Sequence, residues 1–220
     1  MTSAQRRARE KAGTRERILA AARDLVVRHG FDAVSLRDIA RAIDYTAPAL
    51  YTHFRDKHDL LAALCDRDFG LLRDSMRATE RIKDPVARLR AIGRRYVDFA
   101  FEHPNQYRFM FMEPWPADAP AIDGRPDGSI RHGDPDQDAY AFLKVAVAAC
   151  IKAGRLRAEF RDTHIVTQVV WAAAHGVVSL FLTHGHDPWV SFKRPRATAL
   201  KLVDAALRGM ERNPRPRRAP

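Results

Sequence analysis

The sequence predicts an all-α protein in which an N-terminal three-helix bundle with a helix-turn-helix precedes a larger C-terminal helical domain. Apolar residues recur at helical spacing along most of the chain, and no region shows the sustained alternation that predicts a β-strand. The stretch SLRDIARAIDYTAPALYTHF, residues 35–54, adds two short helical segments joined by a tight turn. These observations set the fold class.

Length and charge give the first bounds on function. With 220 residues, 46% of them apolar, the chain is long enough to bury a core, so wholesale disorder is not expected. The formal net charge of +11 suggests a polyanionic partner. Residues 1–17 hold six Lys or Arg against two acids, and the last ten residues contain Arg212, Arg215, Arg217 and Arg218. We therefore expect a disordered basic arm over residues 1–13 and a disordered basic tail over residues 212–220.

The sequence shows no targeting or membrane segment. The N-terminus is charged and lacks an apolar signal region, and no stretch approaches 18 uninterrupted apolar residues, so no transmembrane helix is expected. Cys65 and Cys150 lie inside apolar helical patterns, which favours reduced, buried thiols. The expected location is the cytoplasm, with no membrane partner.

The first helix is expected over about residues 15–29. Thr14 is placed as its N-cap, and Gly30 follows as a left-handed C-cap from which Phe31 folds back onto the last turn. One face carries an apolar stripe at helical spacing, formed by Ile18, Ala21, Ala22 and Leu25. This helix begins the expected three-helix bundle.

The next two helices form the helix-turn-helix. The second begins at Ser35, with Asp38 three residues later giving a start like a capping box. Asp44 lies in the turn, where Asp tolerates the positive φ that such turns demand. Thr46 caps the third helix, and Pro48 falls in its first turn, where its missing N–H costs no hydrogen bond. The third helix, short and aromatic, is typical of a helix that enters the DNA major groove.

A long fourth helix is expected over residues 56–76. Further helices are expected at about 84–102, 104–112, 135–154, 161–184 and 193–211. Between them, residues 113–135 are rich in Pro, Gly and Asp and predict a long loop. The predicted division is a helix-turn-helix domain over residues 14–60 and a ligand-binding and dimerisation domain over residues 61–211.

The first domain resembles the TetR family of bacterial transcriptional regulators. The match covers about residues 14–64, RILAAARDLVVRHGFDAVSLRDIARAIDYTAPALYTHFRDKHDLLAAL, with its Gly30-Phe31 cap and with Lys57 followed by Leu60 and Leu61. The resemblance implies a homodimer that places two recognition helices about 34–36 Å apart on a pseudo-palindromic, double-stranded DNA operator. It also implies a small-molecule effector in the C-terminal domain and no cofactor. The expected function is that of a repressor released by a lipophilic ligand; activation is the less favoured variant.

The candidate DNA-binding residues follow from donor chemistry and from the resemblance. Hydroxyl, phenol and imidazole groups lie on the exposed side of the third helix, small residues lie at its groove-entering end, and basic residues lie near helix N-termini. The resemblance implies that Lys57 contacts the DNA backbone. The full set is Arg15, Ser35, Arg37, Thr46, Ala47, Pro48, Ala49, Tyr51, Thr52, His53 and Lys57.

Three positions depart from the family pattern. The common turn glycine is Asp44, an aliphatic residue is replaced by Tyr45, and a frequent lysine is Ala47. These changes leave few groups for bidentate base recognition, so the sequence does not predict the operator.

The last two helices are expected to form a four-helix dimer interface, because HIVTQVVWAAAHGVVSLFLTHG is apolar on more than one face. WAAAHGVVSL and HPNQYRFMF resemble the subgroup of the family with a Trp-His-Gly signature. Trp171 and His175 share a helical face; they either line a pocket, with His175 bonding to a ligand, or simply pack in the core. The ligand-binding candidates are Tyr96, Phe99, Tyr107, Met110, Phe111, Phe142, Trp171 and His175, although such aromatic residues are commonly plain core.

Two other classes of function remain as alternatives. A nucleoid-type protein would bind DNA through charge alone, without an effector. A small-molecule or metal-dependent enzyme would work from the C-terminal domain. His184, His186 and Asp187 could bind zinc together with a further histidine, but they lack HExxH or CxxC spacing. Because no catalytic signature is present either, we predict no enzyme, no catalytic residue and no metal site.

Overall fold

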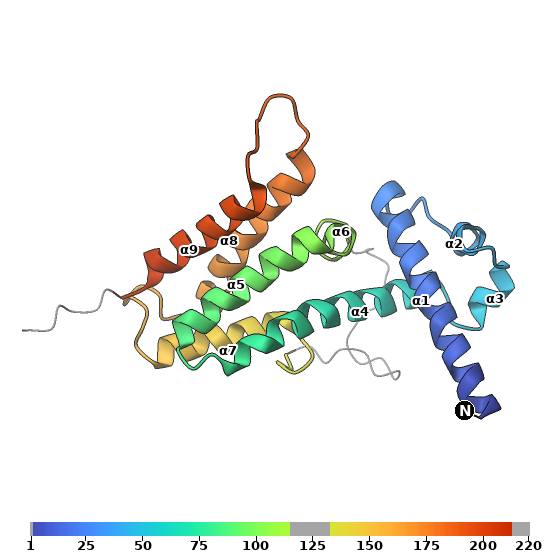
Figure 1. Cartoon of the computed structure of the whole chain (residues 1–220), viewed down its shortest axis with the longest axis horizontal. Coiled ribbons are helices and arrows are strands. Elements are labelled where there is room, and N and C mark those ends of the chain that lie inside the picture. The colour runs from blue at the N-terminus through green and yellow to red at the C-terminus, as the bar shows by residue number, and fades with distance from the viewer. Residues whose placement is uncertain (1, 115–132, 213–220) are drawn as a thin grey trace, which may run out of the picture. The chain divides into compact units, whose positions relative to one another are not determined.

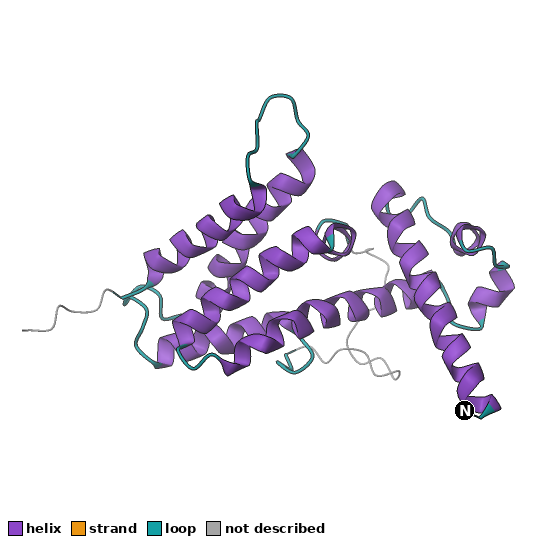
Figure 2. Cartoon of the chain, in the orientation of Figure 1, coloured by secondary structure: helices purple, strands orange, loops and turns teal. Residues whose placement is uncertain are grey.

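The computed structural model describes residues 2–114 and 133–212, and the predicted all-α class is confirmed (Figure 2). Within these residues the only β pairing is an isolated antiparallel bridge between Leu156 and Glu211. The helices are α1 (Ser3–His29), α2 (Leu36–Ala42), α3 (Ala47–Tyr51), α4 (Lys57–Arg77), the 3-10 helix η1 (Ala78–Arg81), α5 (Pro85–Glu102), α6 (Pro104–Phe111), α7 (Ala139–Lys152), α8 (Thr163–His184) and α9 (Pro195–Met210). Most of the predicted loop over 113–135, and residues 213–220 of the predicted tail, lie outside the described residues.

The chain forms two compact units, and their helices are labelled in Figure 1. Among the described residues, the first unit comprises 2–69 and 105–114, and the second comprises 70–104 and 133–212. The division therefore falls within α4 rather than at residue 60, because the apolar residues of the first turns of α4 are buried in the core of the first unit. The first unit also includes α6, through the buried Phe109.

The core of the first unit gathers apolar side chains from four helices. Ile18 of α1, Ile39 of α2, Leu50 of α3 and Leu60 of α4 are all almost fully buried there. Burial of a side chain of this size contributes about 1.5–3 kcal/mol. Packing of these stripes, rather than helix propensity, holds the short helices α2 and α3 in place.

The prediction of a disordered arm over residues 1–13 is wrong. The helix α1 begins at Ser3, and its N-cap is Thr2, whose hydroxyl accepts from Gln5 N while the Gln5 side chain accepts from Thr2 N. Thr14, the predicted N-cap, lies inside the helix. Most residues of the arm are Ala, Arg, Lys, Gln or Glu, which favour helix. A capping box at its start is therefore sufficient to extend α1 through the arm.

The predicted capping box at Ser35 is confirmed, whereas Gly30 and Thr46 differ from the prediction: Thr46 stands at the N-cap of α3 without a side-chain capping hydrogen bond. Ser35 and Asp38 form a complete capping box, and Asp44 takes a φ of 57° in the turn. Gly30 ends α1 with a positive φ of 78°, but its ψ of 160° lies outside the left-handed helical region that we predicted. Phe31 consequently packs on the start of α4, with its ring 5.6 Å from that of His58.

The second unit is built around α5, which packs against α7, α8 and α9. The helices α8 and α9 also pack on each other and lie side by side in Figure 1. Gly93 allows α5 and α9 to approach closely, since a Cβ at this position would lie 2.6 Å from Val203 Cγ1. The core of this unit is therefore a layer of side chains between α5 and its three neighbours.

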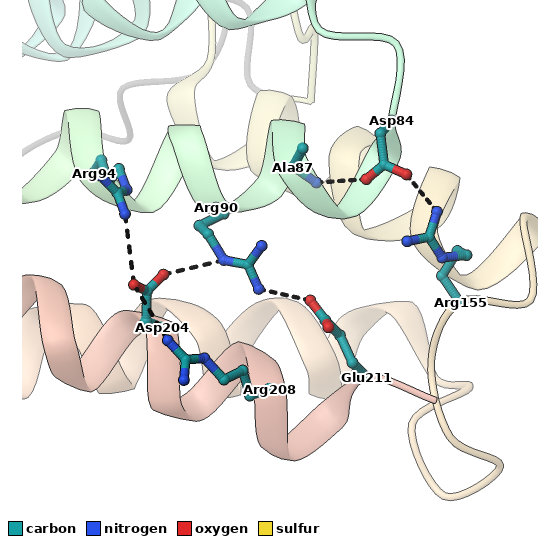
Figure 3. Close-up of polar contacts among 8 residues, drawn as sticks. All are labelled: Asp84, Ala87, Arg90, Arg94, Arg155, Asp204, Arg208 and Glu211. Carbon is teal, nitrogen blue, oxygen red and sulfur yellow. Dashed lines mark hydrogen bonds and ion pairs between the residues drawn. The ribbon is translucent and has the colours of Figure 1, made fainter. Parts of the chain in front are cut away.

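Ion pairs close one end of the second unit (Figure 3). Asp84 caps α5 by accepting from Ala87 N at 2.8 Å and also pairs with Arg155, and these bonds hold the pKa of its carboxyl below the usual value. Arg90 of α5 reaches Asp204 at 3.1 Å and Glu211 at 2.7 Å. These contacts tie the end of α9 to the start of α5 and to the segment after α7.

Among the described residues, α8 is the one helix long and apolar enough to cross a membrane by length and composition. Polar residues interrupt this segment, and the sequence does not predict that it spans a membrane. Buried core helices of soluble proteins have the same length and composition, and α8 packs against α5, α7 and α9. One side of α8 packs within the second unit, while only 33% of its apolar window is buried in the single chain.

Candidate nucleic-acid interface and ligand site

Two buried anchors fix α3 so that its other side faces outward. Leu50 and Phe54 are almost fully buried, whereas Tyr51 is 58% exposed and Thr52 is exposed. The Thr52 hydroxyl donates to Ala49 O at 2.7 Å, which leaves its oxygen lone pairs as acceptors. Tyr51 and Thr52 are therefore presented on the surface, Thr52 as an acceptor.

The remaining candidates near α3 differ in exposure. Thr46, Pro48, Ser35 and Arg37 are exposed, while Ala47 and Ala49 are half-buried. Thr46 stands at the N-cap of α3, but its side chain makes no capping hydrogen bond. Its hydroxyl is thus not committed to the helix that it begins.

Lys57 has a structural contact that the sequence did not reveal. Its Nζ donates to Phe31 O at 2.5 Å and lies 3.8 Å from the centre of the Phe31 ring. The ammonium therefore ties the start of α4 to the connection between α1 and α2. The phosphate contact of Lys57 stays a prediction.

Arg15 also serves the fold of the first unit. Its guanidinium donates to His53 O at 3.3 Å and lies 4.3 Å above the Phe54 ring, so α1 braces the end of α3. Arg17, which is not among the predicted DNA-binding residues, donates to Ile43 O at 3.1 Å and lies above the Tyr45 ring. The face of α1 that passes the helix-turn-helix is consequently basic.

His53 sits within this basic environment. Burial, and then the charges of Lys11 and Arg15, hold the pKa of its imidazole below the usual value. The side chain is therefore neutral at pH 7, and contributes a donor or an acceptor rather than a charge.

A buried ion pair between α1 and α4 was missed by the sequence analysis. Arg23 donates to both carboxylate oxygens of Asp68, at 2.8 and 2.7 Å, and both side chains are buried. Arg23 lies on the face of α1 that the structure buries, with Leu19, Ala22 and Val26, rather than on the predicted stripe, and Asp68 continues the stripe of Leu61, Leu64 and Cys65 on α4. Opposite charges inside two apolar stripes indicate helices that face each other.

In the second unit, three of the predicted ligand-binding residues meet. Trp171 Nε1 donates to the Tyr96 hydroxyl at 3.1 Å, and that hydroxyl lies 3.3 Å from His175 Nδ1. Tyr96 is buried, and His175 is half-buried with its pKa lowered by burial. This arrangement places neutral polar groups inside an apolar body, which suits recognition of a ligand with one polar group.

The other ligand-binding candidates do not all join this cluster. Phe99 and Phe142 are buried in the second unit; the Phe99 ring lies 5.0 Å from that of His103, and Arg88 lies over the Phe142 ring. Tyr107, Met110 and Phe111 belong instead to the first unit. There the Phe111 ring contacts Tyr107 and Phe69.

The histidines near the end of α8 form a local contact. His184 Nδ1 lies 2.6 Å from Asp187 Oδ2, in an exposed turn. In the described part of the chain no group of three or more His, Cys, Asp or Glu side chains is arranged to hold a metal ion. The pair is explained by the turn itself.

Comparison with known proteins agrees with this geometry. Residues 18–64 match the family described as bacterial regulatory proteins, tetR family, and residues 89–206 match the tetracyclin repressor-like C-terminal domain, which spans more than half of the chain. A TetR family transcription regulator from Marinobacter aquaeolei VT8 is similar in structure, with a TM-score of 0.71 and 21% identity over 94% of this chain and 98% of that one.

Two further solved structures share the fold. The fatty acid degradation regulator FadR from Bacillus halodurans has a TM-score of 0.70 and 16% identity, covering 89% of this chain and 95% of its own. A ketosteroid transcriptional regulator of Mycobacterium tuberculosis has a TM-score of 0.65 and 17% identity, covering 91% and 96%. Together with the family matches over both domains, the helix-turn-helix head and the helical body identify the chain as a member of the TetR family of bacterial transcriptional regulators.

Proposed function

We propose that this regulator is a repressor that a small lipophilic ligand releases from its operator. Its family consists of DNA-binding transcription factors rather than enzymes. The observation that carries the proposal is the cluster of Tyr96, Trp171 and His175, which places hydrogen-bonding groups inside an apolar body. Such a cluster supports ligand recognition in the body of a protein whose head binds DNA.

Homodimerisation is part of the proposal. The outward side of α8 carries Ile165, Val169 and Leu180, which are 57%, 40% and 52% exposed, and Leu202 of α9 is 42% exposed. These residues recur at helical spacing on two adjacent helices, so they form one apolar face. A second copy of the chain would cover this face and place two α3 helices on one operator.

Release would follow from differential affinity. A ligand bound near Tyr96 and His175 shifts the protein toward the released state only by the ratio of its affinities for the released and the DNA-binding conformations. A tenfold ratio supplies about 1.4 kcal/mol per site. A ligand with equal affinity for both conformations would bind without an effect on transcription.

A gel-shift competition tests the DNA-binding part of the proposal. The protein is titrated into the intergenic duplex upstream of its own gene, with random duplex as competitor, at about 150 mM salt. The repressor proposal requires a preference of about 10³ or more for the operator. Equal affinity for both duplexes would instead favour the nucleoid-type alternative, whose binding depends on charge alone.

A thermal-shift screen of lipophilic compounds tests the effector part. A ligand present at about 100 times its Kd stabilises the protein by about 2.7 kcal/mol, and the same compound should dissociate the operator complex. The matched variant is Tyr96→Phe, which removes one hydroxyl and retains the ring. Compounds that stabilise both proteins equally and leave the operator complex intact would contradict the assignment of the site.

Substitutions on the head test the candidate DNA-binding residues. Tyr51→Phe and Thr52→Val should change the preference among operator variants, because both groups are exposed on α3. Lys57→Ala should weaken binding to every duplex and reduce the salt slope by about one. Because Lys57 also bonds to Phe31 O, the free energy of unfolding of the Lys57→Ala variant must be measured in parallel. A uniform loss of stability with unchanged DNA preference would overturn the assignment.

A further inference from the structure

We propose that the helical N-terminal arm carries a dedicated phosphate-binding stripe, formed by Arg7 and Lys11 in line with Arg15, which grips the DNA backbone flanking each operator half-site. This inference rests on the proposed DNA-binding function and extends its contact surface beyond the helix-turn-helix. The partner is the sugar-phosphate backbone of duplex DNA, without regard to sequence.

The arm is an ordered and exposed helix. The helix α1 starts at Ser3 behind a complete capping box, and residues 2–13 are all exposed. The twelve residues from Ser3 to Thr14 extend about 18 Å at 1.5 Å per residue. That length corresponds to about five base pairs of DNA.

Three basic residues share one face of this helix. Arg7, Lys11 and Arg15 are spaced four residues apart, so they lie along a single stripe. Arg6 and Arg9 point to other faces. The same spacing that builds an apolar stripe thus builds a cationic one here.

Two acids near the stripe, Glu10 in the arm and Glu16 beyond it, pair with residues outside the stripe. Glu10 pairs with Arg6 at 3.8 Å, and Glu16 pairs with Arg67 of α4 at 2.5 Å. Glu16 is therefore engaged away from the stripe, and Glu10, which neighbours Arg7, pairs with Arg6. The stripe keeps its positive potential, which is what attracts a phosphate backbone.

The stripe is aligned with the reading helix. Arg15 bonds to His53 O at the end of α3, and Lys11 lies near enough to the His53 imidazole to affect its ionisation. The stripe thus continues from the end of α3 along α1 toward Ser3. When α3 enters the major groove, phosphates at the edge of that groove face this part of α1.

The test compares two double variants of equal charge in the full chain. Arg7→Gln with Lys11→Gln removes the stripe, and Arg6→Gln with Arg9→Gln removes two charges from the other faces; glutamine preserves helix propensity. Affinity for operator and for random duplex is measured by fluorescence anisotropy between 50 and 300 mM salt. Circular dichroism verifies that both variants remain helical.

The stripe predicts a loss of tenfold or more in affinity at about 100 mM salt for the Arg7/Lys11 variant on both duplexes, and a salt slope lower by about two per subunit. The hydroxyl-radical footprint of this variant on the operator should lose protection at the outer edges of the site. Equal effects from the two variants, or no effect from either, would overturn the stripe. A wild-type protein without operator preference would contradict the proposed repressor function instead, while the variant comparison would still decide on the stripe.

Discussion

At the scale of single residues, the ion pair of Arg23 with Asp68 offers the sharpest test of the first unit. Both side chains are buried, so removal of one partner leaves the other charge without compensation. We expect Asp68→Ala to lower the free energy of unfolding by about 3–5 kcal/mol in urea denaturation. Glu16→Ala, which removes the partner of an exposed pair, should cost less than about 1 kcal/mol.

A double variant separates the charge effect from the loss of packing. Arg23→Met combined with Asp68→Leu replaces the pair by apolar side chains, and should recover much of the stability that Asp68→Ala loses. If Asp68→Ala costs no more than Glu16→Ala, the pair is not buried in solution and its assigned role is wrong.

His175 gives a prediction of pH dependence. Burial lowers the pKa of its imidazole in the folded protein relative to the unfolded value of about 6.5. The unfolded chain then binds the proton more readily, so this residue's contribution to stability is present above pH 6.5 and is lost as the pH falls below it. Denaturation at pH 7.5 and at pH 5.5 measures this loss. His175→Gln should remove the part of the pH dependence that comes from this histidine.

The matched variant for this titration is Tyr96→Phe. Because burial rather than the hydroxyl shifts the pKa of His175, the phenylalanine variant should retain the pH dependence. An unchanged pH profile in His175→Gln would show that the group titrates normally and is open to water.

At the scale of helices, two glycines predict opposite effects of the same substitution. A Cβ at Gly93 would lie 2.6 Å from Val203 Cγ1 in the contact of α5 with α9, so Gly93→Ala should destabilise the protein by about 1–3 kcal/mol. Gly70 in α4 has no atom within 4 Å of the corresponding position, so Gly70→Ala should stabilise by about 0.5–1 kcal/mol. Thermal melts of both variants check the signs.

Val203→Ala should partly rescue Gly93→Ala, because it removes the methyl group that the new Cβ meets. Double-mutant coupling between the two positions is therefore expected at about 0.5–3 kcal/mol. Strictly additive effects would mean that α5 and α9 are not in contact at this point.

The same scale shows what sequence could and could not predict. Local chemistry predicted the capping box at Ser35 and the positive φ at Asp44, because a few neighbouring residues decide these features. The start of α1 was missed, since the charge of the arm was read as disorder although Thr2 and Gln5 form a capping box. The contacts of Lys57 with Phe31 could not be derived, because they depend on how helices distant in the chain pack.

The candidate ligand site shows the same limit. The shared face of Trp171 and His175 follows from helical spacing, but their bonds to Tyr96 join two helices far apart in sequence. For the same reason, the aromatic residues of α6 could not be assigned to the first unit from their spacing alone.

At the scale of the whole molecule, the exposed apolar face of α8 and α9 gives the last prediction. Leu180→Arg places a charge in this face, and the residue's 52% exposure in the single subunit means that the arginine fits without disturbing the core. We expect a folded monomer by light scattering, with an unchanged free energy of unfolding at low protein concentration. The control is Leu71→Arg, which charges an exposed leucine of α4 and should leave the dimer intact.

Loss of the proposed dimer should also weaken operator binding to the level of a single half-site. Two recognition helices must be held about one helical turn of DNA apart to engage both half-sites, and a monomer retains only one of them. The Leu180→Arg variant should therefore bind the full operator no better than an isolated half-site, whereas Leu71→Arg should retain the full preference. A Leu180→Arg protein that stays dimeric and binds the operator normally would place the interface elsewhere on the chain.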